Sequence, residues 1–377
     1  MGSGGRQPGV PSSVWSSARQ RGLTVWGEME LGYRVLSLAG RWPAWSAAVT
    51  GTNGKTTTTA LLGAIFRASG RSTVVAGNIG TPLCAVAERL TEASALALEV
   101  SSYQLETAEA FRPAVGTVLN VTPDHLARHG TLEAYARAKF RLFQSQGPRD
   151  MAVLNAGDRW CRLLSSSAPG QVVWFGEKRP GPGLEWDGHY LRGLSGRWAA
   201  PRHLPGRHNI DNALAAVACA RALGVPTDAI AQGLARFRGV EHRLEIVRTW
   251  RGIRFVNDSK ATNVDSTRVA LEALSGPLTV ILGGEDKGAP YGPLIPLLRK
   301  KAREVLLIGE ASSVIERQLG GSAPLVRCGT LDRALSHVAR TARSGEDVLL
   351  SPACASFDQF DNFEHRGRRF KELVAAL

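Results

Sequence analysis

The run VTGTNGKTTT, which begins at Val49, combines residue types that bind phosphate. Its two glycines let the backbone curl so that N–H groups point inward at phosphate oxygens, and a helix that starts within the run adds partial positive charge. Lys55 could reach the β- and γ-phosphates of a nucleotide, and the Thr56 hydroxyl could ligate Mg²⁺. The standard phosphate-loop pattern would put its first glycine at Val49, so only the second half of that pattern is present. The run therefore predicts a nucleotide site.

Two further residues are candidate magnesium ligands because of where they follow predicted strands. Glu99 ends one such strand, and His125 follows another by four residues. Ligands of open α/β sheets bind at the carboxyl ends of the strands, which is where both side chains would lie. Each residue also has an ordinary alternative. Glu99 could be a surface or capping carboxylate, and His125 could be a loop histidine or a helix cap, since imidazole is an unusual magnesium ligand.

Several single residues stay ambiguous on their own. Lys139 lies in the helical run ARAKFRLF, where a lysine usually belongs to a solvated face. Asn209 is placed to cap the helix that the segment RHNIDN opens. Lys287 follows two glycines in GGEDKG, which suits a loop-exposed ammonium as well as an ordinary surface lysine. Cys354 has no neighbouring base to make it a nucleophile and fits a small core residue.

The TGTNGKTT form of the loop resembles the ATP-binding loop of the Mur ligase superfamily, whose members join amino acids to carboxylates. Other segments extend the similarity; they are GNIG at 77, EVSSYQLE at 99, NVTPDH at 120, NDSKATN at 257 and SPACASFDQF at 351. The last two are similar to the branch of the superfamily that adds D-glutamate to UDP-N-acetylmuramoyl-L-alanine. The resemblance extends from the region of Pro8 to the C-terminus.

This resemblance implies roles for individual residues. Those implied to bind ATP are Gly51, Asn53, Gly54, Lys55, Thr56, Thr57, Asn212, Arg243, Asp258 and Lys260. Those implied to bind the UDP-sugar substrate or D-glutamate are Asn78, Ser101, His125, Thr262, Lys287, Ser356 and Phe363. The implied catalytic residues are Lys55, Glu99, His125 and Lys139, and the implied metal ligands are Thr56, Glu99, His125 and a carbamate formed from Lys139 and CO₂. Carbamylation needs a neutral amine, hence a lysine pKa lowered by burial or by neighbouring cations.

As a member of this superfamily, the chain would be an ATP-dependent amide ligase of peptidoglycan precursor synthesis. ATP would phosphorylate the L-alanyl carboxylate, and the D-glutamate amine would attack the acyl phosphate. The implied cofactors are ATP and Mg²⁺, and the implied protein is a cytoplasmic monomer. One rival is another ligase of the superfamily, such as a folylpolyglutamate synthase or a diaminopimelate- or lysine-adding enzyme. The SPACAS segment and the absence of an Asp-Asn-Pro-Arg motif argue against it. The other rival is a truncated ATP-binding or regulatory module without turnover.

The composition is that of a folded protein and points to neither a nucleic-acid nor a membrane partner. The 377 residues carry a formal net charge of +13, and 38 of the 46 basic residues are arginines that are spread along the chain. Nucleic-acid-binding modules usually show a clustered basic stripe, so solvated arginines, or a field that attracts anionic nucleotides, explain the charge. No apolar run approaches the roughly 18 residues of a membrane span. The five cysteines are scattered without a CxxC pair, which fits a reducing cytoplasm.

Short apolar strands that alternate with helices predict an α/β protein. With the resemblance, the pattern gives three parts. A remnant of an N-terminal UDP-binding α/β domain is expected at 1–44. A central ATP-binding domain with a phosphate-loop-type, mainly parallel sheet is expected at 45–239. A Rossmann-like, amino-acid-binding domain is expected at 240–377.

The expected elements follow from the apolar periodicity. The opening piece is predicted to hold helices at 12–21 and 28–38 and a short strand at 23–26. The predicted central strands are 46–50, 73–76, 95–100, 115–121, 151–154 and 172–175, with helices at 56–69, 82–90, 103–110, 132–144, 209–223 and 227–237. A hairpin is expected at 184–200, with its turn at Asp187-Gly188. The predicted strands of the last domain are 244–249, 253–257, 279–282, 304–308 and 348–350, with helices at 264–274, 331–343 and 357–377.

Overall fold

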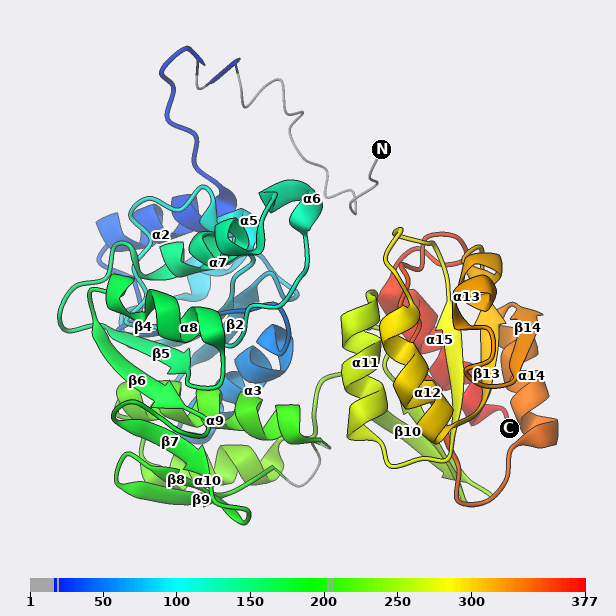
Figure 1. Cartoon of the computed structure of the whole chain (residues 1–377). Coiled ribbons are helices and arrows are strands. Elements are labelled where there is room, and N and C mark those ends of the chain that lie inside the picture. The colour runs from blue at the N-terminus through cyan, green and yellow to red at the C-terminus, as the bar shows by residue number, and fades with distance from the viewer. Residues whose placement is uncertain (1–16, 19, 202–203, 205) are drawn as a thin grey trace. The chain divides into compact units, whose positions relative to one another are not determined.

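The computed structural model describes residues 17–18, 20–201, 204 and 206–377 (Figure 1). These residues form two compact units that divide between Arg238 and Gly239. Each unit is built around one sheet in which most strand pairs are parallel, as the alternating pattern predicts. Within the described residues, no helix has the length and apolar character that crossing a bilayer requires.

The first unit contains a nine-stranded sheet with the strand order β2-β3-β1-β4-β5-β6-β7-β8-β9. Its strands are β1 (Trp45–Thr50), β2 (Thr73–Gly77), β3 (Ala95–Glu99), β4 (Val115–Val118), β5 (Met151–Asn155), β6 (Gln171–Phe175), β7 (Gly183–Trp186), β8 (Tyr190–Gly193) and β9 (Gly196–Ala199). Neighbouring strands from β2 to β7 are parallel, and the β7–β8 and β8–β9 pairs are antiparallel. The expected hairpin is therefore a three-stranded meander at the end of a parallel sheet.

The helices of the first unit bury the sheet and bring its loops into place. They are α2 (Glu28–Leu38), α3 (Lys55–Ala68), α4 (Leu83–Val86), α5 (Ser102–Leu105), α6 (Leu126–His129), α7 (Leu132–Phe140), α8 (Arg159–Leu164), α9 (Arg207–Ala222) and α10 (Thr227–Arg236), with 3-10 turns η1 (Ala87–Arg89), η2 (Arg141–Phe143) and η3 (Ser165–Ser167). β3 is buried at every position, as expected for an apolar strand between two parallel neighbours. The helix α3 packs against α9 and α10. A Cβ on Gly233 of α10 would lie 2.5 Å from Cα of Ile65, so α10 needs a residue without a side chain there.

The second unit contains a six-stranded sheet with the order β10-β11-β15-β12-β13-β14. Its strands are β10 (Glu245–Trp250), β11 (Ile253–Asn257), β12 (Leu278–Gly283), β13 (Ala302–Ile308), β14 (Leu325–Gly329) and β15 (Asp347–Leu350). Only the β10–β11 pair is antiparallel. Its helices are α11 (Val264–Ala273), η4 (Gly292–Leu294), α12 (Ile295–Lys301), α13 (Ser312–Leu319), α14 (Leu331–Thr341) and α15 (Phe363–Ala375).

Several expected elements differ from the structure. The strand predicted at 23–26 is wrong, because these residues have no sheet partner within the described chain, and Leu23 and Trp26 are exposed. The helix predicted at 103–110 ends at Leu105. The helix predicted from Phe357 begins at Phe363, where the side chain of Asn362 accepts the first-turn N–H of His365. β14, α12 and α13 were not predicted. Of the helix predicted at 12–21, residues 12–16 and 19 lie outside the described residues.

Candidate active site

The phosphate loop lies between the end of β1 and the start of α3, in the predicted order of strand, glycine turn and helix. Gly54, the residue before α3, has φ 87°, in the left-handed region that favours glycine. A Cβ on Gly54 would lie 2.2 Å from Oδ1 of Asn212, so the loop meets α9 at this point. Thr56 and Thr57 lie buried in the first turn of α3. The helix N-terminus therefore faces the loop with its hydroxyls close by.

Asn120, which follows β4, holds the loop in shape. Its Oδ1 accepts from the N–H of Asn53 at 2.9 Å, and its Nδ2 donates to the carbonyl oxygen of Asn53 at 3.1 Å. The Thr52 hydroxyl donates to the carbonyl oxygen of Thr122 and accepts from its N–H, at 3.2 and 3.0 Å. The sequence assigned Asn120 no role of its own. It pre-shapes the loop from a neighbouring strand.

Two lysine amines converge on one carbonyl oxygen of the loop. Nζ of Lys55 lies 2.9 Å from the oxygen of Gly51 and 2.7 Å from that of Thr52, and Nζ of Lys139 lies 2.9 Å from the same Gly51 oxygen. Lys139 is only 1% exposed, and its amine lies 4.2 Å from the ring centroid of Tyr135. Burial, and then the charge of Lys55, hold the pKa of Lys139 well below its usual range. The interpretation of Lys139 as a solvated helix lysine is wrong.

Glu99 ends β3 beside the loop, since it pairs in register with Val49 of β1. The side chain is buried, and its Oε1 accepts from Nδ2 of Asn78 at 2.9 Å. Its Oε2 is also buried and has no hydrogen-bond partner among the described residues. A buried carboxylate oxygen without a partner is costly unless a cation or donor reaches it. Glu99 therefore has the environment of a cation ligand, and its interpretation as a surface carboxylate is wrong.

His125 directly precedes α6 with a left-handed φ of 53°. Its Nδ1 lies 3.0 Å from the Tyr103 hydroxyl, and its Nε2 lies 3.6 Å from Oδ2 of Asp124. Burial lowers the pKa of His125, and the charges of Lys55 and Lys139 lower it further against the opposing effect of Asp124. A neutral imidazole keeps the lone pair that a cation ligand needs.

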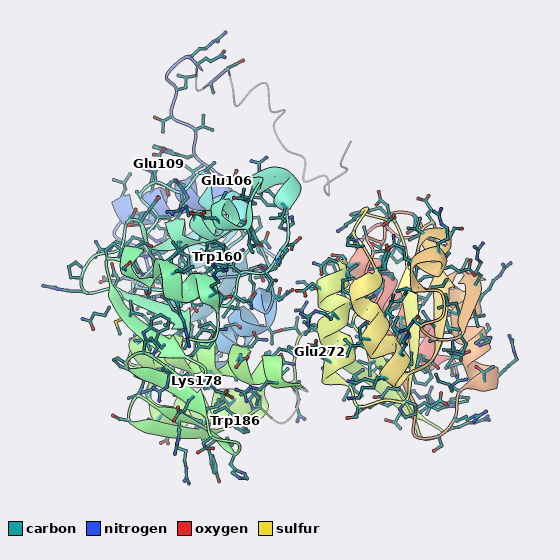
Figure 2. All side chains as sticks on the ribbon, in the orientation of Figure 1. Glu106, Glu109, Trp160, Lys178, Trp186 and Glu272 are labelled. Carbon is teal, nitrogen blue, oxygen red and sulfur yellow. The ribbon has the colours of Figure 1, made fainter. Side chains whose placement is uncertain are left out.

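A second histidine that the sequence analysis did not single out, His129, joins this group. Its Nε2 lies 3.1 Å from the Ser102 hydroxyl, and its ring stacks on Tyr103 with the centroids 5.8 Å apart. An oxygen of Glu106, which is labelled in Figure 2, lies 3.6 Å from its Nδ1. No helix face links the two histidines, because His125 lies before α6; both rings instead meet the ring of Tyr103, with centroids 5.1 and 5.8 Å away.

Two predicted ligands of the first unit also have structural partners. The Ser101 hydroxyl caps α5 by accepting from the N–H of Gln104 at 3.2 Å. Asn212 accepts at Oδ1 from the Thr58 hydroxyl at 3.3 Å and donates from Nδ2 to Oδ1 of Asn209 at 3.1 Å. Because α9 begins before Asn209, the capping interpretation of Asn209 is wrong.

In the second unit, Asp258 is a buried carboxylate at the end of β11. Its Oδ2 accepts from the Ser351 hydroxyl at 2.8 Å, and its Oδ1 accepts from the N–H of Leu244 at 3.2 Å. Burial raises the pKa of Asp258 to about 6, against the opposing charge of Arg243. Nζ of Lys260 lies 5.4 Å from the ring centroid of Phe363, and the N–H of Thr262 donates to the Lys260 carbonyl at 2.9 Å. These predicted ligands therefore occupy one stretch of the unit.

Lys287 is exposed on the loop after β12, and the residue before it fixes that loop. Oδ1 of Asp286 accepts from the N–H of Gly288 at 3.0 Å and from the hydroxyl of Tyr291 at 2.9 Å. The same Tyr291 hydroxyl lies 3.0 Å from Sγ of Cys354. Burial raises the pKa of Cys354 to about 11, so the thiol stays protonated at neutral pH. This agrees with the interpretation of Cys354 as a core residue.

Arg366 on α15 was missed by the sequence analysis and joins the segments that carry predicted ligands. Its guanidinium is fully buried and donates to the Ser259 hydroxyl at 3.0 Å, the Ser259 carbonyl at 2.9 Å and the Ala355 carbonyl at 3.1 Å. The Ser259 hydroxyl in turn donates to the carbonyl of Phe363 at 2.8 Å. The buried residue Ser356 directly follows Ala355. The positions of Ser356 and Phe363 are therefore coupled through Arg366 and Ser259.

Two family descriptions and several solved structures match this chain. The family description "Mur ligase middle domain" matches residues 49–220, and "Mur ligase, glutamate ligase domain" matches residues 242–354. Among solved structures, MurF from Acinetobacter baumannii has a TM-score of 0.71 at 22% identity and covers 93% of this chain and 79% of that one. E. coli FolC in complex with ADP has a TM-score of 0.70 at 18% identity and covers 99% of each chain. At these identities the likeness supports the fold.

Curated relatives are more similar in sequence. The UDP-N-acetylmuramoylalanine–D-glutamate ligase of Koribacter versatilis (strain Ellin345) is 44% identical over 379 residues, which cover 98% of this chain and 82% of that protein. The enzyme of the same name from Anaeromyxobacter dehalogenans (strain 2CP-C) is 46% identical over 97% of this chain and 82% of that protein. The expected resemblance is thus confirmed, and the chain belongs to the Mur ligase family, in its UDP-N-acetylmuramoylalanine–D-glutamate ligase branch.

Proposed function

We propose that this chain is the ATP-dependent ligase that adds D-glutamate to UDP-N-acetylmuramoyl-L-alanine in peptidoglycan precursor synthesis. The observation that carries the proposal is the pair of amines, from Lys55 and Lys139, on the carbonyl oxygen of Gly51 in the phosphate loop. Phosphoryl transfer depends on positioned positive charge more than on covalent help from the protein. The names of the relatives supply the two molecules that are joined.

The proposed reaction has two steps. An oxygen of the L-alanyl carboxylate bonds to the γ-phosphorus of ATP, and ADP leaves. The amine nitrogen of D-glutamate then attacks the carbonyl carbon of the acyl phosphate, and phosphate leaves from the tetrahedral intermediate. The amine must attack without its extra proton, and water must be kept from the acyl phosphate.

ATP binding is assigned to residues of both units. The loop residues Gly51, Gly54, Lys55 and Thr57 hold phosphate oxygens through N–H groups and the Lys55 ammonium. Asn53 contributes to the ATP site by fixing the loop through its two hydrogen bonds with Asn120. Asn212 supports the loop from α9, as its contact with the Gly54 position indicates. In the second unit, Asp258 accepts from ribose hydroxyls, and Arg243 and Lys260 balance phosphate charge.

The residues present fit a magnesium ion near the loop. Glu99 offers a buried Oε2 without a partner among the described residues, Thr56 offers a hydroxyl in the first turn of α3, and His125 offers a neutral nitrogen. When bound, Mg²⁺ would offset the negative charge of the phosphate oxygens. Asn78 donates to Oε1 of Glu99 and so orients the carboxylate. Oε2 stays available for the ion.

Lys139 is proposed to carry a carbamate. Its buried amine has a depressed pKa, so the neutral form that carbamylation needs is more populated than in an exposed lysine. The nitrogen lone pair bonds to the carbon of CO₂ and the amine releases a proton, which converts a cation into an anion. That anion would balance Lys55 and add an oxygen ligand for a cation beside the loop.

Substrate recognition is assigned to the remaining residues. The Lys287 ammonium binds a carboxylate of D-glutamate, and the hydroxyls of Thr262 and Ser356 orient the amino acid, with Phe363 packing against it. Asn78 and Ser101 are assigned to the UDP-sugar substrate in the first unit. We place the enzyme in the cytoplasm as a monomer.

Phosphate release tests the proposed function. The purified chain is given ATP, Mg²⁺ and UDP-N-acetylmuramoyl-L-alanine with D-glutamate, L-lysine or meso-diaminopimelate. We expect phosphate release with D-glutamate alone. Release with only L-lysine or only meso-diaminopimelate would contradict the substrate assignment. No release with any amino acid, together with heat of Mg-ADP binding in calorimetry, would instead indicate a nucleotide-binding module without turnover.

A further inference from the structure

Arg243, one of the proposed phosphate ligands, lies between two residues with left-handed backbone. His242 has φ 61° and Leu244 has φ 45°, and neither is a glycine. Such conformations are unfavourable for residues other than glycine, and they persist only where the surroundings hold them. The bend at residues 241–245 therefore needs support from outside itself.

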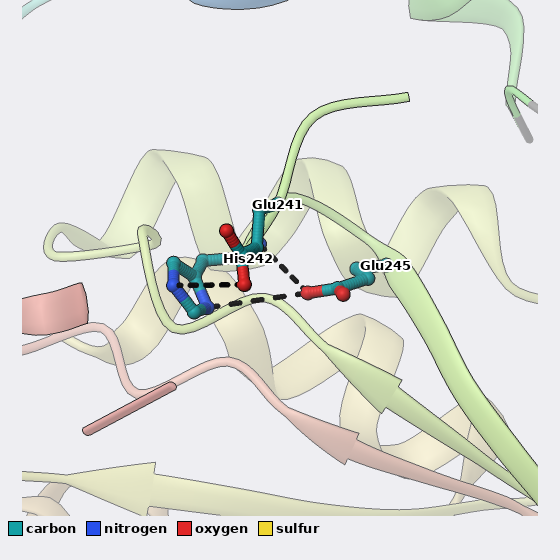
Figure 3. Close-up of side chains that lie close together, drawn as sticks. All are labelled: Glu241, His242 and Glu245. Atoms are coloured by element: carbon teal, nitrogen blue, oxygen red, sulfur yellow. Dashed lines mark hydrogen bonds and ion pairs between the residues drawn. The ribbon is translucent and has the colours of Figure 1, made fainter. Parts of the chain in front are cut away.

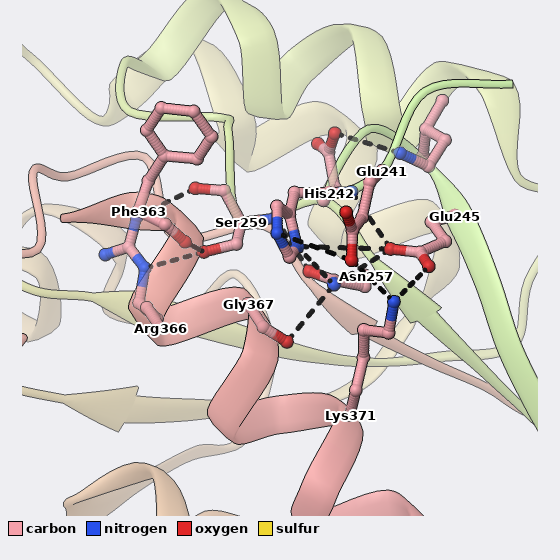
Figure 4. A network of polar contacts seen from close by, with 11 residues as sticks. Glu241, His242, Glu245, Asn257, Ser259, Phe363, Arg366, Gly367 and Lys371 are labelled. Carbon is pink, nitrogen blue, oxygen red and sulfur yellow. Dashed lines mark hydrogen bonds and ion pairs between the residues drawn. The ribbon is translucent and has the colours of Figure 1, made fainter. Parts of the chain in front are cut away.

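The buried ring of His242 provides part of that support. Its Nδ1 accepts from Nδ2 of Asn257 at 2.9 Å, and the same Nδ2 lies 3.3 Å from the carbonyl of Gly367 on α15 (Figure 4). A Cβ on Gly367 would lie 2.2 Å from that Nδ1, so the ring fits against a position that only glycine leaves open. The ring also meets Phe363 edge-on, with the centroids 6.3 Å apart.

Two glutamates close the bend, and one lysine of α15 holds both. Oε2 of Glu245 accepts from the N–H of His242 at 2.9 Å. Nζ of Lys371 donates to Oε1 of Glu241 and to Oε1 of Glu245, each at 2.8 Å (Figure 4). The ammonium thus ties the first and last residues of the bend to the C-terminal helix.

Glu241, His242 and Glu245 are also close enough together to suggest a metal site, as Figure 3 shows. The contacts argue against one. The Lys371 ammonium already supplies the cation between the two carboxylates, and Nδ1 of His242 already accepts from Asn257. The cluster is therefore a satisfied ion-pair network and has a structural purpose.

The purpose of the network follows from the residues that the bend contacts. Its Leu244 N–H donates to Oδ1 of Asp258 at 3.2 Å, and its His242 carbonyl accepts from the N–H of Lys260 at 3.1 Å. Together with Arg243, these are the ATP ligands assigned to this unit. We infer that Lys371 is a positioning residue for ATP, acting through Glu241 and Glu245. The inference rests on the proposed ATP-binding role of the unit.

Kinetics of Lys371→Met test the inference, with Arg369→Met as the matched control. Arg369 lies on the same helix and pairs only with the surface carboxylates Asp332 and Glu372 among its described salt bridges. We expect Lys371→Met to raise KM for ATP and Kd for Mg-ADP roughly five- to tenfold, with KM for D-glutamate within twofold. Lys371→Arg should restore most of the loss, because a guanidinium also spans two carboxylates. The control should change neither constant.

Three results would contradict the inference. Unchanged ATP and ADP constants in Lys371→Met, or an equal change in Arg369→Met, would overturn it. A double variant of Lys371→Met and Glu245→Gln should be no worse than the poorer single variant, and additive losses would contradict the route through Glu245. Mg-ADP calorimetry tests the inference even if the wild-type chain shows no turnover, because it measures binding alone. Failure of the inference can therefore be distinguished from failure of the proposed function.

Discussion

The side-chain amines of Lys55 and Lys139 both donate to the carbonyl oxygen of Gly51, each at 2.9 Å. Two ammonium groups at one acceptor repel each other, and the fully buried one is the easier to neutralise. The arrangement is stable if Lys139 loses its proton or becomes an anion. It therefore connects the shape of the phosphate loop to the chemical state of a lysine on α7.

Replacement of Lys139 tests this connection directly. We expect Lys139→Ala to lower kcat by roughly 100-fold or more, since a charge is lost beside the reacting phosphate. Short-chain carboxylic acids should restore part of the rate by placing an anion in the vacated volume. Arg137→Ala, on the exposed face of the same helix, is the control. An unchanged rate in Lys139→Ala would refute the carbamate proposal.

Gly54→Ala separates backbone strain from steric contact at the loop. Gly54 and Gly70 have similar φ values, 87° and 83°, but a Cβ on Gly70 would meet nothing within 4 Å. Both substitutions should cost about 1–2 kcal/mol of stability from the left-handed conformation. Only Gly54→Ala should also displace Asn212 and weaken Mg-ADP binding in calorimetry. Equal Mg-ADP affinity in the two variants would show that the contact with Asn212 is unimportant.

The buried carboxyl of Asp258 predicts a stability that falls as pH rises. Its pKa of about 6 lies above the value of an unfolded aspartate, so the folded state binds the proton more tightly. Folding is therefore penalised progressively as pH rises from about 4 through about 6, by up to about 3 kcal/mol once Asp258 is ionised. Asp258→Asn should unfold at a higher temperature than wild type at pH 8 and lose that advantage at pH 4.

The same variant should bind ATP less well, because the proposed ribose acceptor is lost. Asp361→Asn, at an exposed carboxyl of the same unit, is the control for a general charge effect. A difference in thermal midpoint between Asp258→Asn and wild type that does not change from pH 4 to pH 8 would contradict the assignment.

Tyr291→Phe removes one oxygen atom from the support of the Lys287 loop. Asp286 would lose the hydroxyl bond and keep only the N–H of Gly288 among its described hydrogen bonds. We expect KM for D-glutamate to rise by roughly three- to tenfold, with KM for ATP within twofold. Tyr190→Phe, at an exposed position of β8, should change neither constant. A selective change in KM for ATP would indicate that the loop serves the nucleotide instead.

The parts that could be predicted from sequence are those encoded locally. The phosphate loop joins a strand to a helix within ten residues, so the sequence alone locates its glycines, Lys55 and Thr56. The parallel sheets follow from apolar runs that alternate with helices. The prediction of a strand at residues 23–26 was wrong because a strand forms only where a partner strand lies beside it, which a local pattern does not show. β14 was missed because it is short and only partly buried, with an arginine at its centre.

Contacts between distant segments could not be read in the same way. Lys371 meets Glu241 across 130 positions, and Lys139 meets Gly51 across 88. Neither run of sequence marks its lysine as special, since both lie in ordinary helical surroundings. Arg366 likewise looks like one of many arginines until the fold buries it among carbonyl groups. The contacts of such residues arise only when whole helices and strands pack together.

The strand order of the second sheet has a consequence for biosynthesis. β15 lies between β11 and β12, although the chain makes it after every other strand. Until the ribosome has released residues 347–350, the edges of β11 and β12 that pair with β15 have no partner strand. The sheet of the first unit needs no segment made so late. The first sheet and its phosphate loop are therefore expected to fold on the nascent chain before the second sheet can be completed.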